Sequence, residues 1–201
     1  MDFRERLERN QLRSFALLES YKNGIRDFSR VDLREINLTG CNLRGIDLRG
    51  ADLICANLRS CKLQGASLED AYLRGANLRY AQLQGAVLSR AVFRDADLTH
   101  SNLDKAVAIE VRFWDTCLDR ASLKGIDLTR AVFERSSLVG VELLQANISD
   151  LILSQTDLTR ANFKGARGFD GRFVPHEMQG CLQKDTVKPD GSIEVGPVWF
   201  D

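Results

Sequence analysis

The chain repeats itself every five residues over most of its length. Every fifth residue from Phe28 to Phe163 is Leu, Phe or Ile, with the single exception of Ala108. This makes 28 consecutive five-residue units without an insertion or a deletion, about 70% of the chain. A period of five fits neither the 3.6-residue period of a helix nor the two-residue period of a strand. The pattern predicts a solenoid, in which each unit buries its apolar face by stacking on copies of itself.

The repeated unit reads Ala, then Asp or Asn, then Leu, followed by two variable residues. Clean copies begin at Ala51, Ala56, Ala76, Ala96 and Ala161. These units resemble the pentapeptide repeat family. The resemblance implies a right-handed, four-sided parallel β-helix with one pentad on each face and four pentads in each coil. It also implies binding to other macromolecules, since family members typically act in this way and the best-understood subgroup binds DNA gyrase by imitating DNA.

The expected fold is therefore an all-β solenoid of about seven coils, a right-handed quadrilateral parallel β-helix with an N-terminal α-helical cap and a C-terminal capping tail. We divide the chain into a helical cap over 1–24, the pentapeptide-repeat β-helix over 25–166 and a C-terminal cap or tail over 167–201. Seven coils at a strand spacing of ~4.8 Å make a rod roughly 34 Å long.

Residues 20 apart should lie in one column on successive coils. Phe93, Phe113 and Phe133 share a column, so their rings should stack. Ala108 leaves a local void in the coil of Phe113, and we interpret the two as a volume exchange because cores are densely packed. Gly recurs at the last pentad position, where a type II turn needs a positive φ. One outer edge alternates in charge: Asp70, Arg90, Glu110, Arg130, Asp150.

The odd number of cysteines, five, argues against a disulfide framework. Cys41 and Cys61 share an inward column. In-register neighbours hold their Cβ atoms ~4.8 Å apart, more than the ~3.5–4.5 Å of a disulfide, so we expect two buried free thiols. Cys55, Cys117 and Cys181 show no metal-ligand spacing. With no apolar run of membrane length and no signal-peptide pattern, we expect a cytoplasmic protein without membrane contact.

Both ends of an open coil must be closed. Residues 2–22 read as an amphipathic helix that covers the first coil and stops at Gly24; a partner-binding helix is the alternative. Its predicted inward stripe comprises Phe3, Leu7, Phe15, Leu18 and Tyr21.

The tail over 167–201 is too apolar to be disordered. We expect a short helix over 175–182 and a hairpin over 186–195 around Pro189-Asp190-Gly191. In the gyrase-binding relatives the C-terminal segment makes the dimer, so the tail is either a cap or a dimerisation element.

Apolar residues interrupt the polar outer positions of the C-terminal half. By column they fall on two adjoining faces as one patch, and exposed contiguous apolar surface often marks a contact site. The alternative is that the apolar tail folds over the patch. The residues are Val87, Val92, Val107, Ile109, Trp114, Val132 and Ile152.

The sequence carries no sign of catalysis. The two histidines, His100 and His176, have no metal-ligand spacing to another ligand residue, and the glycines follow the pentad turn and form no phosphate loop. Serines and aspartates are frequent, but a nucleophile needs an adjacent base and an orienting group, and nothing in the pattern suggests one. We expect no enzyme, no metal and no cofactor.

Three functions are compatible with these features. The first is a non-catalytic scaffold that presents the patch to a protein partner, or to itself as a homodimer through the patch or the tail. The second is a DNA mimic that modulates gyrase, although 19 basic and 18 acidic residues from Arg26 to Lys164 lack the negative excess that a mimic needs. The third is nucleic-acid binding along columns such as Arg34, Arg74 and Arg94, or Arg59 and Arg79, which mixed charge disfavours. The partner, its pathway and the oligomeric state do not follow from the sequence.

Overall fold

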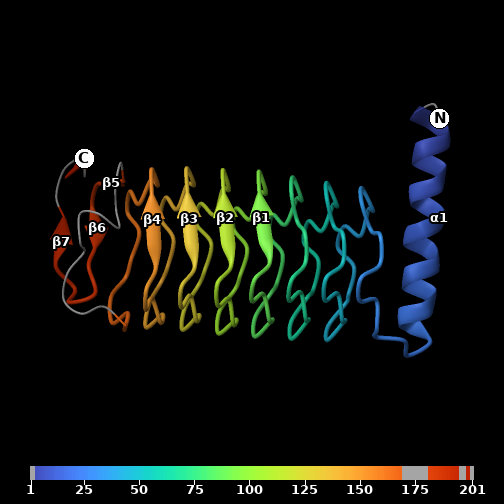
Figure 1. Cartoon of the computed structure of the whole chain (residues 1–201), viewed down its shortest axis with the longest axis horizontal. Helices are drawn as coiled ribbons and strands as arrows, with labels where there is room; N and C mark the ends of the chain where they lie inside the picture. Colours follow the sequence, from blue (N-terminus) through green and yellow to red (C-terminus); the bar gives the residue numbers. More distant parts are fainter. Residues whose placement is uncertain (1–2, 169–180, 195–197, 200–201) are drawn as a thin grey trace.

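The structure, a computed structural model, describes residues 3–168, 181–194 and 198–199. It is a right-handed quadrilateral parallel β-helix. Figure 1 shows helix α1 across one end of the rod and strands β5, β6 and β7 at the other. The elements are α1 (Phe3–Lys22), β1 (Val92–Arg94), β2 (Arg112–Trp114), β3 (Val132–Glu134), β4 (Ile152–Ser154), β5 (Leu182–Gln183), β6 (Thr186–Val187), β7 (Ile193–Glu194) and β8 (Val198–Trp199). The predicted fold class is confirmed.

Successive coils pair in parallel with an offset of 20 residues. In the strands Phe93 pairs with Phe113 and Phe113 with Phe133, and isolated bridges carry the same offset from Asp27 to Arg167. The column spacing expected from the sequence is therefore correct throughout the repeat. We number the four faces by their central residues: the first face holds residues 28 to 148 in steps of 20, the second 33 to 153, the third 38 to 158 and the fourth 43 to 163.

The central residue of each pentad and the residue two before it fill the core. The rings of Phe93, Phe113 and Phe133 stack with centroids 4.9 and 4.6 Å apart, as predicted. Stacked rings of this separation add to the free energy that their burial contributes.

The void at Ala108 has a nearer compensation than Phe113. Val111 stands in the inward position that Ala91 and Ala131 hold in the neighbouring coils, and it is fully buried. Phe93 and Phe133 pack in coils whose first-face residue is the larger Leu88 or Leu128. Because the same phenyl ring fits beside Leu in those coils, we assign the volume exchange to Val111 and not to Phe113.

Most corners are β-turns with a positive φ at the last pentad position. The amide of Ala56 donates to the carbonyl of Leu53 at 3.0 Å, and Cys55 between them has φ 56°. Gly65 has φ 65°, as predicted, but Tyr80 adopts φ 59° at the same pentad position. Stacking therefore holds non-glycine residues in a conformation that glycine adopts more easily, at a cost of order 1 kcal/mol each.

On the second face a side chain replaces the turn's backbone hydrogen bond in three coils. The hydroxyl of Thr116 donates to the carbonyl of Phe93 at 2.6 Å, and Ser136 and Thr156 act in the same way on Phe113 and Phe133. The longer strands β1 to β4 all lie on this face. The second face therefore presents the broadest regular strand surface of the rod.

Helix α1 covers the first coil through its C-terminal half. Leu17 is buried, Leu18 packs against the core, and the Tyr21 hydroxyl donates to the carbonyl of Arg44 at 2.8 Å. The predicted inward stripe is correct for Leu18 and Tyr21 and wrong for Phe15, which is 65% exposed. The side chains of Phe3 and Leu7 lie outside the described part of the structure.

The helix ends as the sequence predicts. The amide of Gly24, which has φ 91°, donates to the carbonyl of Tyr21, and the amide of Ile25 donates to the carbonyl of Ser20, both at 3.0 Å. This pair of hydrogen bonds is a Schellman motif, which satisfies the last carbonyls of a helix. The chain thus leaves α1 directly into the first coil.

At the other end the coil stacking resumes beyond the predicted boundary at residue 166. The amides of Arg160 and Phe163 donate to the carbonyls of Lys184 and Val187 at 2.7 and 2.8 Å. Asn162 bridges to Val187 with an offset of 25 residues in place of 20. The 20-residue offset between coils therefore holds up to Arg167, and the offset at Val187 is five residues longer. Two further pentad-like units, with Cys181 and Thr186 as their inward residues, stack on the last coil.

The predicted hairpin is confirmed. Strands β6 and β7 pair antiparallel around the Pro189-Asp190-Gly191 turn, and the amide of Lys188 donates to the carbonyl of Ser192 at 2.8 Å. Strand β8 pairs antiparallel with β5. The predicted helix over 175–182 lies outside the described residues except for its end, where Leu182 belongs to β5. Within the described residues, no helix has the length and apolar character that a membrane span requires.

Candidate interaction surface

The sequence-predicted patch divides into two groups on the rod. Val87, Val107 and Ile109 lie on the first face, where Val87 bridges to Val107. Val92, Trp114, Val132 and Ile152 lie on the second face. Ile152 is 47% exposed and Val107 36%, whereas the other five are half-buried.

A charged corner separates the two groups. Arg90 pairs with Asp70 at 2.7 Å and with Glu69 at 3.1 Å, and Arg130 pairs with Glu110 at 2.9 Å. Each arginine thus pairs with the preceding coil, so the alternating edge forms discrete ion pairs. The hydrogen bond from Arg90 lowers the pKa of Asp70 below its ordinary value. The predicted patch is therefore two apolar strips on either side of a salt-bridged corner.

The strip on the second face contains three arginines with little or no ion pairing. In the described structure Arg74 and Arg112 form no ion pair, and Arg94 reaches only Asp95, at 3.6 Å. Arg112 lies over the Trp114 ring, 5.8 Å from its centroid. The other arginines of this face and the corner beyond it are paired: Arg34 with Asp32 at 2.6 Å, and Arg135 with Asp115 at 2.8 Å. The middle of the second face therefore carries three arginines with little ion pairing, whereas the arginines toward its two ends are paired.

Tyr72 belongs to the same surface, although sequence reasoning missed it. It precedes Val92 in its column, bridges to it, and is 55% exposed. With Val92, Glu110 and Arg112 it lines a groove of about 240 Å³ beside the charged corner. Its place in the column of Val92 and Val132 was the available signal. We define the arginine–aromatic surface as Tyr72, Arg74, Val92, Arg94, Arg112, Trp114 and Val132.

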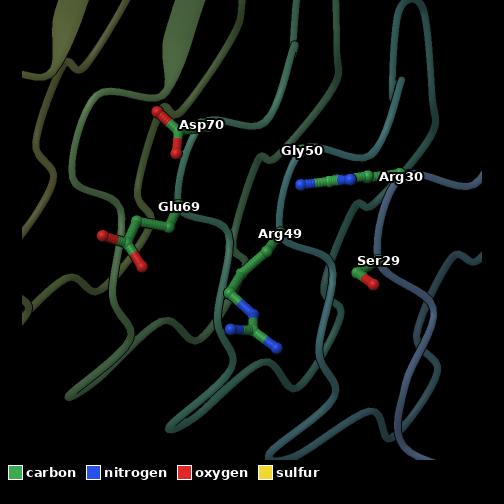
Figure 2. Close-up of a pocket in the computed structure, with 6 residues that line it drawn as sticks. All are labelled: Ser29, Arg30, Arg49, Gly50, Glu69 and Asp70. Atoms are coloured by element: carbon green, nitrogen blue, oxygen red, sulfur yellow. The ribbon is translucent and has the colours of Figure 1, made fainter.

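A larger groove of about 400 Å³ follows the same corner toward the N-terminal end. Figure 2 shows Arg30 extended beside Gly50, with Arg49, Glu69 and Asp70 around it. A Cβ atom at Gly50 would lie 3.4 Å from Cγ of Arg30, so the two positions are in direct contact across adjacent coils. Arg49 pairs with Asp47, while Glu69 and Asp70 both pair with Arg90. These internal ion pairs account for most of the charge that lines this groove.

The basic column of the third face is engaged within the protein. Arg79 pairs with Asp97 at 3.1 Å, and the Arg59 guanidinium lies 4.9 Å from the Tyr80 ring centroid. Tyr80 also stacks on His100, with centroids 5.2 Å apart. Ring stacking and cation–π contact stabilise this column, because each ring face is covered by the neighbouring coil.

The thiols of the inward column are free. Cys61 is buried and its sulfur donates to the carbonyls of Leu38 and Cys41, both at 3.3 Å, whereas Cys41 is only half-buried. Burial raises the pKa of Cys61 to about 12. A thiol held neutral in this way is a poor nucleophile. Among the described residues, no group of three or more histidine, cysteine or acidic side chains is placed to hold a metal ion.

The family model for pentapeptide repeats matches the chain at residues 27–65, 51–90, 86–125 and 126–165. Since these matches span more than half of the sequence, the chain belongs to the pentapeptide repeat family. Curated proteins give no significant match.

Solved structures of the same family are similar to the chain. A pentapeptide repeat protein from Nostoc PCC 7120 is 42% identical over 47% of this chain and 78% of its own, with a TM-score of 0.46. HetL, involved in heterocyst differentiation regulation in Nostoc sp. strain PCC 7120, is 26% identical over 89% of this chain and 98% of its own, with a TM-score of 0.27. QnrB1, a plasmid-mediated fluoroquinolone resistance protein, is 17% identical over 80% of this chain and 86% of its own, with a TM-score of 0.40.

Proposed function

We propose that the chain is a non-catalytic protein-interaction module that binds an acidic protein partner through the arginine–aromatic surface. The supporting observation is that Arg74 and Arg112 form no ion pair in the described structure and Arg94 reaches only Asp95, on the face that also carries Trp114. Arginine and aromatic residues are enriched where interfaces derive their binding energy.

Fold stability does not explain these arginines. Arg74 and Arg94 are in the same column of adjacent coils, where like charges stacked on a sheet destabilise the pairing. Columns on the neighbouring corners place an acid on the preceding coil of Arg90, Arg130 and Arg135. A partner that supplies carboxylates would relieve the repulsion, while Val92 and Val132 supply apolar contact.

The test is capture of a partner from a cell lysate with the intact protein and with a Trp114→Asp, Val132→Asp variant. The control is Val107→Asp, which puts an aspartate before the central residue of a first-face pentad, as Val132→Asp does on the second face. We expect the second-face variant to weaken capture by about tenfold or more, and the first-face variant to leave it unchanged. Circular dichroism verifies that all three proteins are folded.

The outcome also separates the two strips of the original patch. A partner lost only with Val107→Asp would assign the contact to the first face and contradict the proposal. Equal capture by every variant would contradict any role of the patch and direct attention to the tail.

The charge distribution does not favour the nucleic-acid alternatives. A gyrase-modulating DNA mimic needs an acidic face, yet the broadest strand surface of this rod carries unpaired arginines. Direct DNA binding would use those arginines and would weaken steeply with salt. A supercoiling assay and a DNA mobility shift test the two alternatives, and a positive result in either would displace the proposed protein partner. The cytoplasmic location remains a prediction that cell fractionation tests.

A further inference from the structure

The outer side of helix α1 carries the most exposed large apolar side chains of the described chain. Leu12 is 70% exposed and Phe15 65%. The inner side of the same helix holds Ser14 and Leu17, which are buried against the first coil. A helix that only caps the coil needs one apolar side, so the second one is unexplained by the fold.

The outer residues form a stripe that is symmetric about Phe15. Positions 8, 12, 15, 19 and 22 follow steps of three and four residues and therefore lie on one side of a helix. Glu8 is near one end of the stripe and Lys22 at the other, seven residues before and after Phe15. Glu19 is 46% exposed and lies 3.8 Å from Lys22, whose side chain is 77% exposed.

We propose that this stripe binds a second copy of the chain, with the two α1 helices antiparallel and Phe15 at the twofold axis. Antiparallel pairing places Glu8 beside Lys22 of the second copy at both ends of the contact, and the two Phe15 rings meet at the centre. Parallel pairing would bring Glu8 to Glu8 and Lys22 to Lys22, so charge selects the antiparallel arrangement.

The geometry of the rod allows this contact. Figure 1 shows α1 lying across the end of the β-helix, so its outer side faces away from the coils. Two molecules joined through α1 would lie end to end, as one rod of about double length with both C-terminal hairpins at its outer ends. The arginine–aromatic surface stays open in such a dimer, so this inference does not depend on the proposed partner. Two apolar residues from each copy predict a weak, concentration-dependent association.

Sedimentation equilibrium of the full chain over a wide range of concentrations tests the proposal. We expect the wild type to form dimers and Phe15→Glu to raise the dissociation constant by at least about tenfold. The matched control is Ile193→Glu, which places the same charge at a residue 58% exposed at the opposite end of the rod. Ile193→Glu should leave the dimer intact.

The charged ends give a second test. Lys22→Glu should weaken the dimer by about threefold, because each Glu8 then faces a carboxylate. The double variant Glu8→Lys, Lys22→Glu should restore wild-type association, since both end contacts regain opposite charges. A wild type that stays monomeric, or a dimer that survives Phe15→Glu and fails with Ile193→Glu, would overturn the proposal. Helical content from circular dichroism confirms that each variant retains α1.

Discussion

Two serines buried inside the coils differ in whether their hydroxyl groups form a hydrogen bond. The hydroxyl of Ser136 donates to the carbonyl of Phe113 at 3.2 Å, so it is satisfied within the core. Ser101 is equally buried, but its hydroxyl has no hydrogen-bond partner. Most inward positions of this kind hold alanine, for example Ala81 and Ala121 on either side of Ser101. The same residue type therefore stands in one favourable and one unfavourable environment.

Replacing each of these serines by alanine should have opposite effects. We expect Ser101→Ala to raise the free energy of unfolding by about 1 kcal/mol, because it removes an unsatisfied buried hydroxyl. Ser136→Ala should lower it by about 1 kcal/mol, because the carbonyl of Phe113 loses a donor. Urea unfolding of the two variants measures both changes. Equal destabilisation by both would contradict the hydrogen-bond assignment.

Within a single coil, a smaller side chain at one core position is offset by a larger side chain at another. Ala108 and Val111 in one coil replace the Leu and Ala that the neighbouring coils hold at these positions, as Leu88 and Ala91 do. Their summed volume is similar, so the core density is kept by redistribution within the coil.

A double-mutant cycle tests this exchange. Ala108→Leu alone should cost about 1–3 kcal/mol by overpacking, and Val111→Ala alone about 1–2 kcal/mol by leaving a cavity. The combined variant reproduces the neighbouring coils and should be within about 1 kcal/mol of the wild type. Thermal or urea unfolding of the four proteins gives the coupling energy. Additive losses would show that Val111 does not compensate for Ala108.

The register of the coils was predictable because the large apolar residue at the centre of each pentad must face the core. A shift by one residue would expose Leu or Phe, so the period alone fixed the columns of Phe113 and Cys61. The return of the tail at Cys181 was not predictable in the same way, since the chain inserts five residues and the column spacing changes to 25. The sequence did contain one indication of this return: Cys181 and Thr186 are small residues five positions apart, and both are buried.

The candidate surface was predictable only in part. Column arithmetic placed Val92, Trp114 and Val132 together on one face. It could not tell which arginines find a carboxylate, because that depends on side-chain conformations across adjacent coils. For α1, both sides of the helix carry apolar residues, so periodicity alone assigned Phe15 to the wrong side.

For the whole molecule, ionisable groups lower the free energy of unfolding at both low and high pH. Arginine hydrogen bonds lower the pKa of Asp70 and Asp115 below the ordinary 3.8. Burial raises the pKa of Cys61 from 9.0 to about 12. A lowered carboxyl pKa stabilises the fold above 3.8, and that contribution is lost as the pH falls further. A raised thiol pKa stabilises the fold fully below 9.0, and that contribution is lost as the pH rises toward 12.

The unfolding free energy should therefore be nearly constant between about pH 4 and pH 9 and fall on both sides. On the alkaline side, Cys61 alone should account for roughly 3–4 kcal/mol by pH 12, because the unfolded chain ionises this thiol and the folded coil does not. Urea unfolding at a series of pH values measures the profile. In Cys61→Ala, which places the common inward residue at this position, the alkaline decline should become shallower while the acid decline stays the same. An unchanged alkaline slope in that variant would show that other groups, and not the buried thiol, limit the stability of the rod at high pH.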